Sequence, residues 1–189
     1  MLRQLRPAIV VLALMTALTG LVYPLLVTGV AQLAFSDEAD GSEITRDGEV
    51  VGSSLIAQPF EGDEWFQPRP SGVDFDAAGS GGVNLGPTNP ELLDTIAERA
   101  VEYRQRNGLA DGVPVPVDAV TSSASGLDPH VSVRNARMQA PRVAEARDLA
   151  VDAVLALVEA HTEARTLGVL GEPRVNVVQL NADLAGLAR

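Results

Sequence analysis

The chain has 189 residues with a formal net charge of −11, and all 14 of its cations are arginine. It contains no cysteine and only two histidines, His130 and His161, which excludes disulfides, thiolate nucleophiles and three-histidine zinc sites. The acidic balance argues against nucleic acid as a partner, because phosphate binding needs a basic face. The charge is unevenly distributed, since residues 37–189 hold all 25 acidic residues and all but two of the cations, a net charge of −13.

The N-terminal part contains an uncharged and mostly apolar stretch of 28 residues, 8–35. About 20 apolar residues are enough to span a bilayer core, so the stretch predicts one transmembrane helix. Pro24 lies inside it and predicts a kink near residues 21–23. A secretory signal peptide is the alternative, but its apolar core measures only about 7–15 residues, and residues 31–34 make a poor cleavage site. We therefore expect an uncleaved anchor.

The charges on either side of this stretch predict its orientation. Arg3 and Arg6 precede it, and an acidic segment, residues 37–40, follows it. The positive-inside rule then places residues 1–7 in the cytoplasm and residues 36–189 outside, in a single-pass protein of the cell membrane.

Several polar or small residues inside the predicted span favour contact with other helices over contact with lipid. Hydroxyl and amide groups can bond across a helix interface, and glycine allows close backbone approach. We expect the following residues to pack against partner helices: Gly20, Tyr23, Pro24, Thr28, Gly29 and Gln32.

The segment after the span predicts β-structure. An Asp-Gly pair at 47–48 lies between β-prone residues 44–46 and 50–51, which is a hairpin signal. Residues 54–57 extend the second strand, and residues 65–66 begin a third. The Gly-, Ser-, Asn- and Pro-rich residues 71–90 predict a long loop, a feature that is usually functional or disordered.

Helices dominate the rest of the sequence, so that residues 36–189 as a whole predict a mixed α/β domain. Asn89, Pro90 and Glu91 are typical of a helix start, and Asn107-Gly108 of its end. Leu93, Ile96, Ala97, Ala100 and Val101 form one apolar face of this helix. The remaining elements are an edge-like strand at 113–121, a polar loop at 121–132, helices at 134–147 (weakened by Pro141) and 149–164, a buried strand at 175–180 and a short helix at 182–187.

The sequence offers no convincing catalytic centre. Ser123, Ser125, Asp128 and His130 supply the residue types of a serine hydrolase, but there is no G-x-S-x-G elbow around them. A turn network, in which these side chains bond to nearby backbone, is the preferred interpretation. The glycine-rich residues 79–86 lack a cation to hold phosphate, so we interpret them as a loop.

Two arginines and one histidine outside this group have structural interpretations. Arg69 and Arg174 are expected to be members of ion pairs. His161 follows Val154 and Val158 at helical spacing and is expected to pack against the core. We predict no catalytic residue, no metal site and no cofactor of the chain's own.

Blocks of sequence along nearly the whole chain follow an order found in one known family. The first block is GLVYPL at residues 20–25, and the last is GEPRVNV at residues 171–177. Between them lie the blocks at 52–58, 65–71, 80–89, 120–130, 139–144 and 161–163. Together they resemble the C-subunit family of Kdp-type potassium-transporting ATPases. Ala57, Trp65, Val83, Pro141 and Asp148 depart from the usual family residues, but none of them replaces a candidate catalytic group.

The resemblance implies a subunit of an ATP-driven potassium import complex, with a channel-like K⁺-translocating subunit and a P-type ATP-hydrolysing subunit as partners. ATP and K⁺ would be handled by the complex. Two roles have been proposed for the family: a catalytic chaperone that raises ATP affinity, and an outer cap over the ion entrance. The predicted orientation favours the cap, because ATP lies on the opposite side of the membrane, and an effect on ATP affinity would require allosteric coupling.

The resemblance is concentrated in two polar loops, residues 80–89 and 121–130. We expect them to form one surface that docks on the channel-like partner, with arginines as anchors; in the alternative, their side chains only satisfy their own loop backbones. The docking candidates are Gln58, Arg69, Asn84, Asn89, Ser125, Asp128, His130, Arg142 and Arg174. Two other functions remain open: an anchored ligand-binding protein without a transport partner, and an anchored hydrolase that would lose esterase activity in Ser125→Ala.

Overall fold

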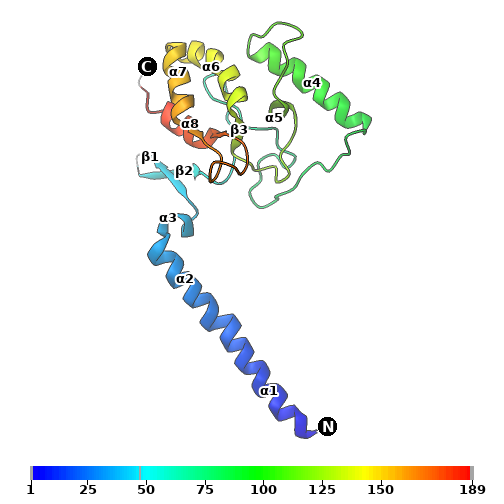
Figure 1. Cartoon of the computed structure of the whole chain (residues 1–189), viewed down its shortest axis with the longest axis vertical. Coiled ribbons are helices and arrows are strands. Elements are labelled where there is room, and N and C mark those ends of the chain that lie inside the picture. Colours follow the sequence, from blue (N-terminus) through cyan, green and yellow to red (C-terminus); the bar gives the residue numbers. More distant parts are fainter. Residues whose placement is uncertain (1, 47, 188–189) are drawn as a thin grey trace. The chain divides into compact units, whose positions relative to one another are not determined.

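The computed structural model describes residues 2–46 and 48–187 and divides the chain into two compact units (Figure 1). The first unit ends at Glu43, and the second begins at Ile44. The second unit therefore starts later than the domain predicted from residue 36, because residues Ser36–Ala39 form a short helix, α3, that belongs to the first unit.

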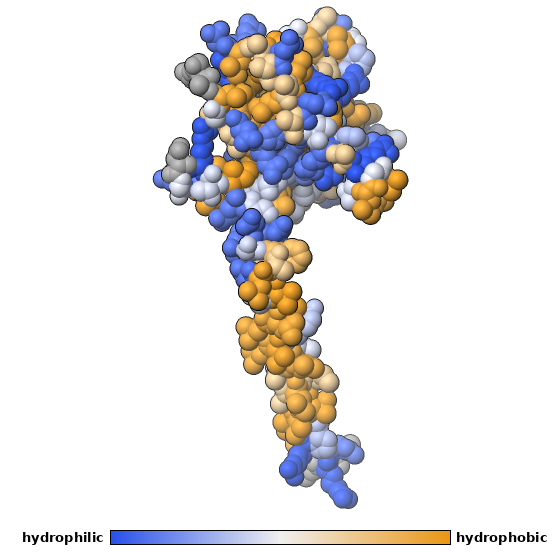
Figure 2. Space-filling view, turned by 60° about the vertical axis from the view of Figure 1, so that its left-hand side comes forward, coloured by the Kyte–Doolittle hydropathy of each residue, from blue (hydrophilic) through white to orange (hydrophobic). Residues whose placement is uncertain are grey.

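The first unit is built on one long helix. It consists of α1 (Leu2–Ala17), a π-helical turn η1 (Leu18–Val22) and α2 (Tyr23–Ala34). Over Arg3–Ala34 it is long and apolar enough to cross a membrane. Its most apolar stretch of 18 residues has a mean hydropathy of 2.3, and no residue of that stretch is buried. Figure 2 shows it as a column of apolar residues with polar ones at its N-terminal end. The predicted single N-terminal apolar helix is confirmed.

The kink predicted near residues 21–23 is replaced by the π-helical turn η1. Pro24 has no N–H, and in a regular helix its ring would clash with the carbonyl of Gly20. The preceding turn is widened instead, so that the N–H of Tyr23 donates to the carbonyl of Leu18, five residues back. In Figure 1, α1 and α2 continue along one line.

The second unit begins with the predicted hairpin. Strands β1 (Glu43–Arg46) and β2 (Glu49–Ser53) pair with each other. Gly48 adopts a φ of 83°, which the turn requires and glycine tolerates, while Asp47 lies outside the described residues. The predicted extension of the second strand through residues 54–57 is wrong, because the chain turns after Ser53 and its carbonyl accepts from the N–H of Ile56 at 3.4 Å.

The strand predicted at residues 65–66 is also wrong, for a specific reason. The N–H of Phe66 donates to Oδ1 of Asn181 at 3.0 Å, and Nδ2 of Asn181 donates to the carbonyl of Phe66 at 2.9 Å. Gln139 contacts Gln67 in the same way, at 2.7 and 3.1 Å. Two side-chain amides therefore do what a neighbouring strand would do, and the segment needs no strand partner.

A small antiparallel sheet organises the domain. Its strands are β3 (His130–Ser132), β5 (Arg174–Asn176) and β4 (Thr162–Glu163), in the order β3-β5-β4. Val175 lies opposite both Val131 and Thr162. β3 and β4 were not predicted, since two or three residues carry little periodicity.

Two other predicted strands need correction. Residues 113–121 contain no strand, and Val117–Val120 form a helical turn, α5. The strand predicted at 175–180 stops at Asn176, because the side chain of Asn176 accepts from the N–H groups of Val178 and Gln179 and caps a helix. This helix, α8 (Val177–Leu184), also replaces the short helix predicted at 182–187.

The longer helices agree with prediction more closely. α4 (Pro90–Arg106) starts at the Asn89 cap, whose side chain accepts from the N–H of Glu91 at 2.9 Å. α6 (Val133–Arg147) runs through Pro141 and ends at Asp148, which has a φ of 54°. α7 (Val151–Ala160) is shorter than the predicted 149–164, because β4 follows it almost directly.

The hydrophobic core lies among α6, α7, α8 and the small sheet. It contains Phe66, Val131, Ala136, Ala140, Val143, Ala144, Val154, Val158, Val175, Val177, Leu180 and Leu184, all 2% exposed or less. Figure 1 shows α6, α7 and α8 grouped together, with α4 on the other side of the domain, beyond α5. None of the residues of α4, all of which are described, is buried, so its predicted apolar face does not belong to the core.

Candidate docking surface

The two loops predicted to form one surface lie against each other. The N–H of Gly81 donates to the carbonyl of Ser125 at 2.8 Å, and Oγ of Ser80 donates to the same carbonyl at 3.2 Å. A Cβ at Gly82 would lie 2.9 Å from the carbonyl oxygen of Ala124, so only glycine permits this approach. The structure thus brings residues 80–82 and 124–126 together, while docking on a partner stays a prediction.

Gly126 fixes the junction between these loops and Ser71. It has a φ of +71°, and a Cβ there would lie 2.6 Å from Cγ2 of Val73 and 2.9 Å from the carbonyl oxygen of Gly81. Oγ of Ser71 donates to the carbonyl of Gly126 at 2.8 Å and accepts from the N–H of Phe75 at 2.9 Å. The long loop is therefore held by directional hydrogen bonds.

The polar residues that have the types of a serine hydrolase bond mainly to the backbone. Oγ of Ser125 accepts from the N–H of Leu127 at 3.1 Å, and Oγ of Ser123 accepts from the N–H of Asp128 at 3.4 Å. Oδ1 of Asp128 accepts from the N–H of His130 at 3.0 Å. These contacts are the predicted turn network.

A chain of hydrogen bonds and ion pairs leads from these loops across the small sheet. Arg69 Nη1 lies 3.5 Å from Asp128 Oδ2, and Asp128 Oδ1 lies 3.0 Å from Nδ1 of His130. Nε2 of His130 lies 3.9 Å from Oε1 of Glu163, whose Oε2 pairs with Arg174 at 2.8 Å. Burial of Asp128 favours its neutral form, but the hydrogen bonds and charge of His130, with the charge of Arg69, outweigh burial and lower its pKa.

Arg69 and Arg174 are members of ion pairs, as predicted. Arg69 Nη2 also donates to the carbonyls of Thr121 and Ser122, at 3.4 and 3.1 Å, which ties it to the second loop. His161, expected to pack, has a mostly buried side chain whose Nε2 lies 2.9 Å from Asp183 Oδ2.

The loops border two open clefts. One, of about 600 Å³, is lined by Arg69, residues 82–85, the first half of α4 and residues 121–124. The other, of about 630 Å³, is lined by Arg69, residues 55–56 and residues 123–125 and 127–130. Arg69, Ser123 and Ala124 line both clefts, and Arg69 is the charged residue among the three.

Three further docking candidates have local structural roles. Asn89 caps α4, and Nδ2 of Asn84 donates to the carbonyl of Gly82 at 2.9 Å. Gln58 packs against Gly52, where a Cβ would lie 2.7 Å from its Oε1. A role in docking stays a prediction for all three.

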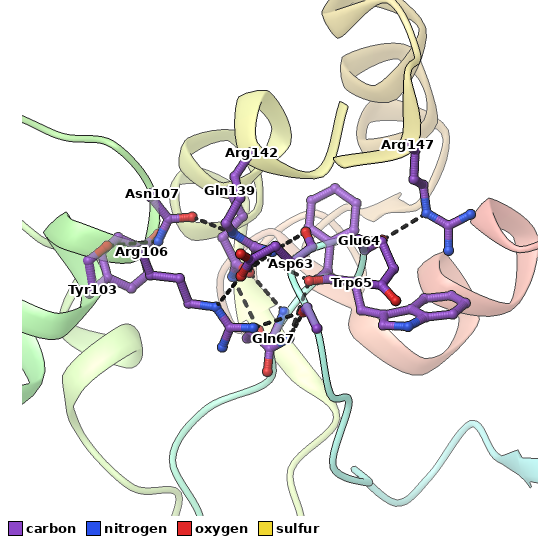
Figure 3. A network of polar contacts seen from close by, with 12 residues as sticks. Asp63, Glu64, Trp65, Gln67, Tyr103, Arg106, Asn107, Gln139, Arg142 and Arg147 are labelled. Carbon is purple, nitrogen blue, oxygen red and sulfur yellow. Dashed lines mark hydrogen bonds and ion pairs between the residues drawn. The ribbon is translucent and has the colours of Figure 1, made fainter. Parts of the chain in front are cut away.

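Arg142, the remaining candidate, lies inside the domain (Figure 3). Its side chain is 6% exposed. Its Nε donates to Oδ1 of Asn107 at 3.0 Å, and its Nη2 donates to the carbonyl of Trp65 at 3.1 Å and to Oε1 of Gln139 at 2.9 Å. Nη1 donates to the carbonyl of Asp63. Because the guanidinium bonds to groups inside the domain, Arg142 ties α6 to the extended segment 63–67 and to the end of α4.

The surroundings of Arg142 shift two pKa values. Burial, together with the nearby charge of Arg106, lowers the pKa of Arg142 to about 10. Burial also raises the pKa of Tyr103, whose hydroxyl donates to Oδ1 of Asn135 at 2.8 Å. In Figure 3, Tyr103, Asn107 and Gln139 surround Arg142 on the side away from Arg147.

Sequence reasoning missed the amides that organise this network. Gln139 and Asn181, each 1% exposed, pair with the extended segment 63–67, and Asn135 links Gln139 to Tyr103. For Asn181 the available signal was an amide among the apolar residues Val177, Leu180 and Leu184 of one helix. Arg147 completes the attachment, with Cζ 4.3 Å from the ring centroid of Trp65 and Nε donating to the carbonyl of Glu64.

The packing candidates of the span are all exposed in the chain by itself. They comprise Gly20, Tyr23, Pro24, Thr28, Gly29 and Gln32. A Cβ at Gly20 or Gly29 would meet nothing within 4 Å. Nε2 of Gln32 donates to Asp40 at 3.0 Å. Packing against other helices therefore stays a prediction.

The fold and this surface define a class of protein: a mixed helix-and-sheet domain preceded by one helix of membrane-spanning length. Residues 5–186 match the family model described as the K⁺-transporting ATPase c chain, KdpC. The chain belongs to this family, and the resemblance read from its sequence blocks is confirmed.

Its relatives match it over nearly their full length. The potassium-transporting ATPase KdpC subunit of Mycobacterium tuberculosis (strain H37Rv) is 55% identical over 186 residues, covering 97% of this chain and 98% of the relative. The KdpC subunit of Rhodospirillum rubrum is 53% identical over 187 residues, 97% of this chain and 96% of the relative. That of Cereibacter sphaeroides is 50% identical over 184 residues, 97% of each chain.

Proposed function

We propose that this chain is the non-catalytic accessory subunit of an ATP-driven potassium import complex. It assembles with a channel-like K⁺-translocating subunit and a P-type ATP-hydrolysing subunit, which handle K⁺ and ATP. The supporting observation is the match to the c chain of K⁺-transporting ATPases over residues 5–186, which includes both the apolar helix and the domain. Co-purification tests this proposal: a tagged chain should recover both partner subunits from membranes, and recovery of neither would favour an anchored ligand-binding protein.

The proposed topology has the N-terminus in the cytoplasm and the domain outside. Arg3 and Arg6 precede the apolar helix, and the segment after it is acidic, as the positive-inside rule requires. Because the chain has no cysteine, an Asp111→Cys variant carries a single thiol at an exposed position. An impermeant thiol reagent should label it in intact cells. Labelling only after lysis would refute the topology.

With the domain outside, its role is that of a cap at the ion entrance. ATP is on the other side of the membrane, so any effect on ATP affinity acts through the complex as a coupling between distant sites. The loop surface at residues 80–82 and 124–126, with Arg69 beside it, contacts the channel-like partner. An interfacial charge left without its partner costs about 2–5 kcal/mol, so one substitution should matter.

A paired experiment separates docking from loop scaffolding. Asp128→Ala and Arg69→Ala should reduce assembly or K⁺-stimulated ATPase activity of the complex while the chain stays folded, with a melting temperature lowered by no more than about 4 °C, as for the loss of one partly exposed ion pair. Arg165→Ala is the matched control, because its pair with Glu172 is exposed and lies outside this surface. A larger loss of melting temperature together with loss of activity favours the scaffold alternative; normal activity in a folded chain refutes docking by these residues.

The span is proposed to assemble as well as anchor. Pro24 and the polar Gln32 have little use in lipid but fit against neighbouring helices. Replacing residues 8–35 with an unrelated single span should release the chain from its partners. Unchanged recovery of the complex would mean that the domain carries assembly by itself.

A further inference from the structure

Helix α4 carries an exposed apolar stripe that the domain does not use. Leu93 and Val101 are 53% and 50% exposed, and Ala97 between them is exposed as well. The three are spaced four residues apart, so they line up along one flank of the helix. The domain contacts the helix through other residues: Arg99 donates to the carbonyl of Val120, and Tyr103 donates to Asn135.

An acidic stripe runs directly beside the apolar one. Asp94, Glu98 and Glu102 follow each apolar residue by one position, and all three are exposed. Among the described residues, none of these carboxylates forms an ion pair. Like charges four residues apart destabilise a helix, so the stripe weakens α4 in the free chain, and a cation outside the domain would offset that cost.

The cations on α4 itself are engaged elsewhere. Nε of Arg104 donates to the carbonyl of Val113 at 2.9 Å, and Arg106 pairs with Asp63 at 3.1 Å. Arg99 points toward α5, where Nη1 donates to the carbonyl of Val120 at 3.2 Å. The acidic stripe is therefore available to an external partner.

We propose that this flank of α4 docks on a protein surface that places apolar side chains beside lysine or arginine, on a partner subunit of the complex. The inference rests on the proposed function. Charge favours a partner subunit over the other surfaces that could cover this flank. An anionic lipid surface would repel the acidic stripe, and a second copy of the same flank would bring like charges together. A basic-edged apolar surface satisfies both stripes at once.

Photocrosslinking in the assembled complex tests this docking. The crosslinking amino acid p-benzoylphenylalanine is placed at Ala97 or, as a matched control, at Ala156, an exposed alanine of α7. After recovery through a tag on this chain, irradiation should link Ala97 to a partner subunit and leave Ala156 unlinked. A link from Ala97 to lipid or to a second copy, no link, or equal links from both positions would each overturn the inference.

Charge reversal supplies the second readout. Glu98→Arg should weaken recovery of the complex about twofold to fivefold, the range for losing an exposed ion pair. Glu145→Arg, at an exposed position of α6, should not. Equal recovery of the two variants would overturn the inference. If the complex forms normally but Ala97 gives no crosslink, the docking of α4 is refuted and the proposed function stands. If the unmodified chain recovers no partner, the proposed function is refuted and the docking of α4 with it.

Discussion

Removing the guanidinium of Arg142 should destabilise the domain far more than removing an exposed arginine from the same helix. Arg142→Ala deprives four acceptors of their donor: Oδ1 of Asn107, the carbonyls of Asp63 and Trp65, and Oε1 of Gln139. A hydrogen bond from a charged group contributes about 1.5–3 kcal/mol, and an orphaned buried acceptor costs about 1–3 kcal/mol.

The full sum of those costs is not expected, for two structural reasons. A cleft of about 560 Å³ lined by Asp63, Asn107 and Arg142 lets water reach part of the vacated site. The carboxylate of Asp63 is 64% exposed and stays solvated, so no buried charge is left behind. We therefore expect a loss of about 2–4 kcal/mol, or about 5–15 °C in melting temperature for a chain of this size.

The assay is thermal melting of the full chain in detergent, followed by Trp65 fluorescence. Trp65 is the only tryptophan, and its carbonyl accepts from Arg142, so the signal reports on the affected segment. Arg137→Ala is the control: its pair with Glu159 is exposed on both sides, and such pairs contribute about 0–1 kcal/mol. Equal shifts for the two variants, or a melt of Arg142→Ala within the error of the unsubstituted chain, would refute the reasoning.

Three further substitutions test the loop surface and the polar network by thermal melting. Gly126→Ala should destabilise the chain by about 1–3 kcal/mol, because its φ is positive and the new Cβ would meet Val73; a neutral result would contradict the packing. The pKa of Asp128 is lowered in the folded chain, so the carboxylate stabilises the fold above a pH of about 4 and ceases to do so as the pH falls through its pKa in the folded chain. The loss of unfolding free energy in Asp128→Asn should therefore shrink in acid, and a loss that is unchanged at a pH of about 3 would refute this. The pKa of Tyr103 is raised in the folded chain, so its contribution to stability is complete below a pH of about 10 and is lost as the pH rises further. Tyr103→Phe should therefore reduce the fall in unfolding free energy at alkaline pH, and an unchanged fall would contradict this.

Elements with local signals could be predicted from the sequence. The apolar helix, the hairpin around Gly48 and the start of α4 at Asn89 each depend on residues close together in the chain, and each appears in the structure. Of the loops predicted at 80–89 and 121–130, residues 80–82 and 124–126 lie together in the structure, and their close approach requires the glycine at 82.

The wrong predictions at 65–66, 175–180 and Arg142 have one thing in common, which is that polar side chains bond to groups inside the domain. Residues 65–66 look like a strand, but Asn181 of α8 bonds to the backbone of Phe66, and Gln139 of α6 bonds to the backbone of the next residue, Gln67. Asn176 ends β5 because its side chain caps the next helix. Arg142 looked like a surface anchor because arginine is usually exposed, and only the assembled fold reveals its four internal acceptors.

The hydrogen bonds that hold the loop surface and the segment before it are consistent with the proposed role of this surface in docking. A long loop loses conformational entropy when it becomes ordered, and a loop ordered before binding adds less to the cost of association. Ser71 and the Gly81–Ser125 contact order the loop surface in the free chain, while Arg142 and Gln139 hold the segment leading to Arg69. Hydrogen bonds fix direction and register as apolar packing does not, so a surface built on them presents Arg69 in one orientation. A partner that recognises this orientation binds without first ordering the loops. We therefore expect a substitution in the buried network to lower both the stability of the domain and its docking, and a substitution on the exposed surface to lower docking alone.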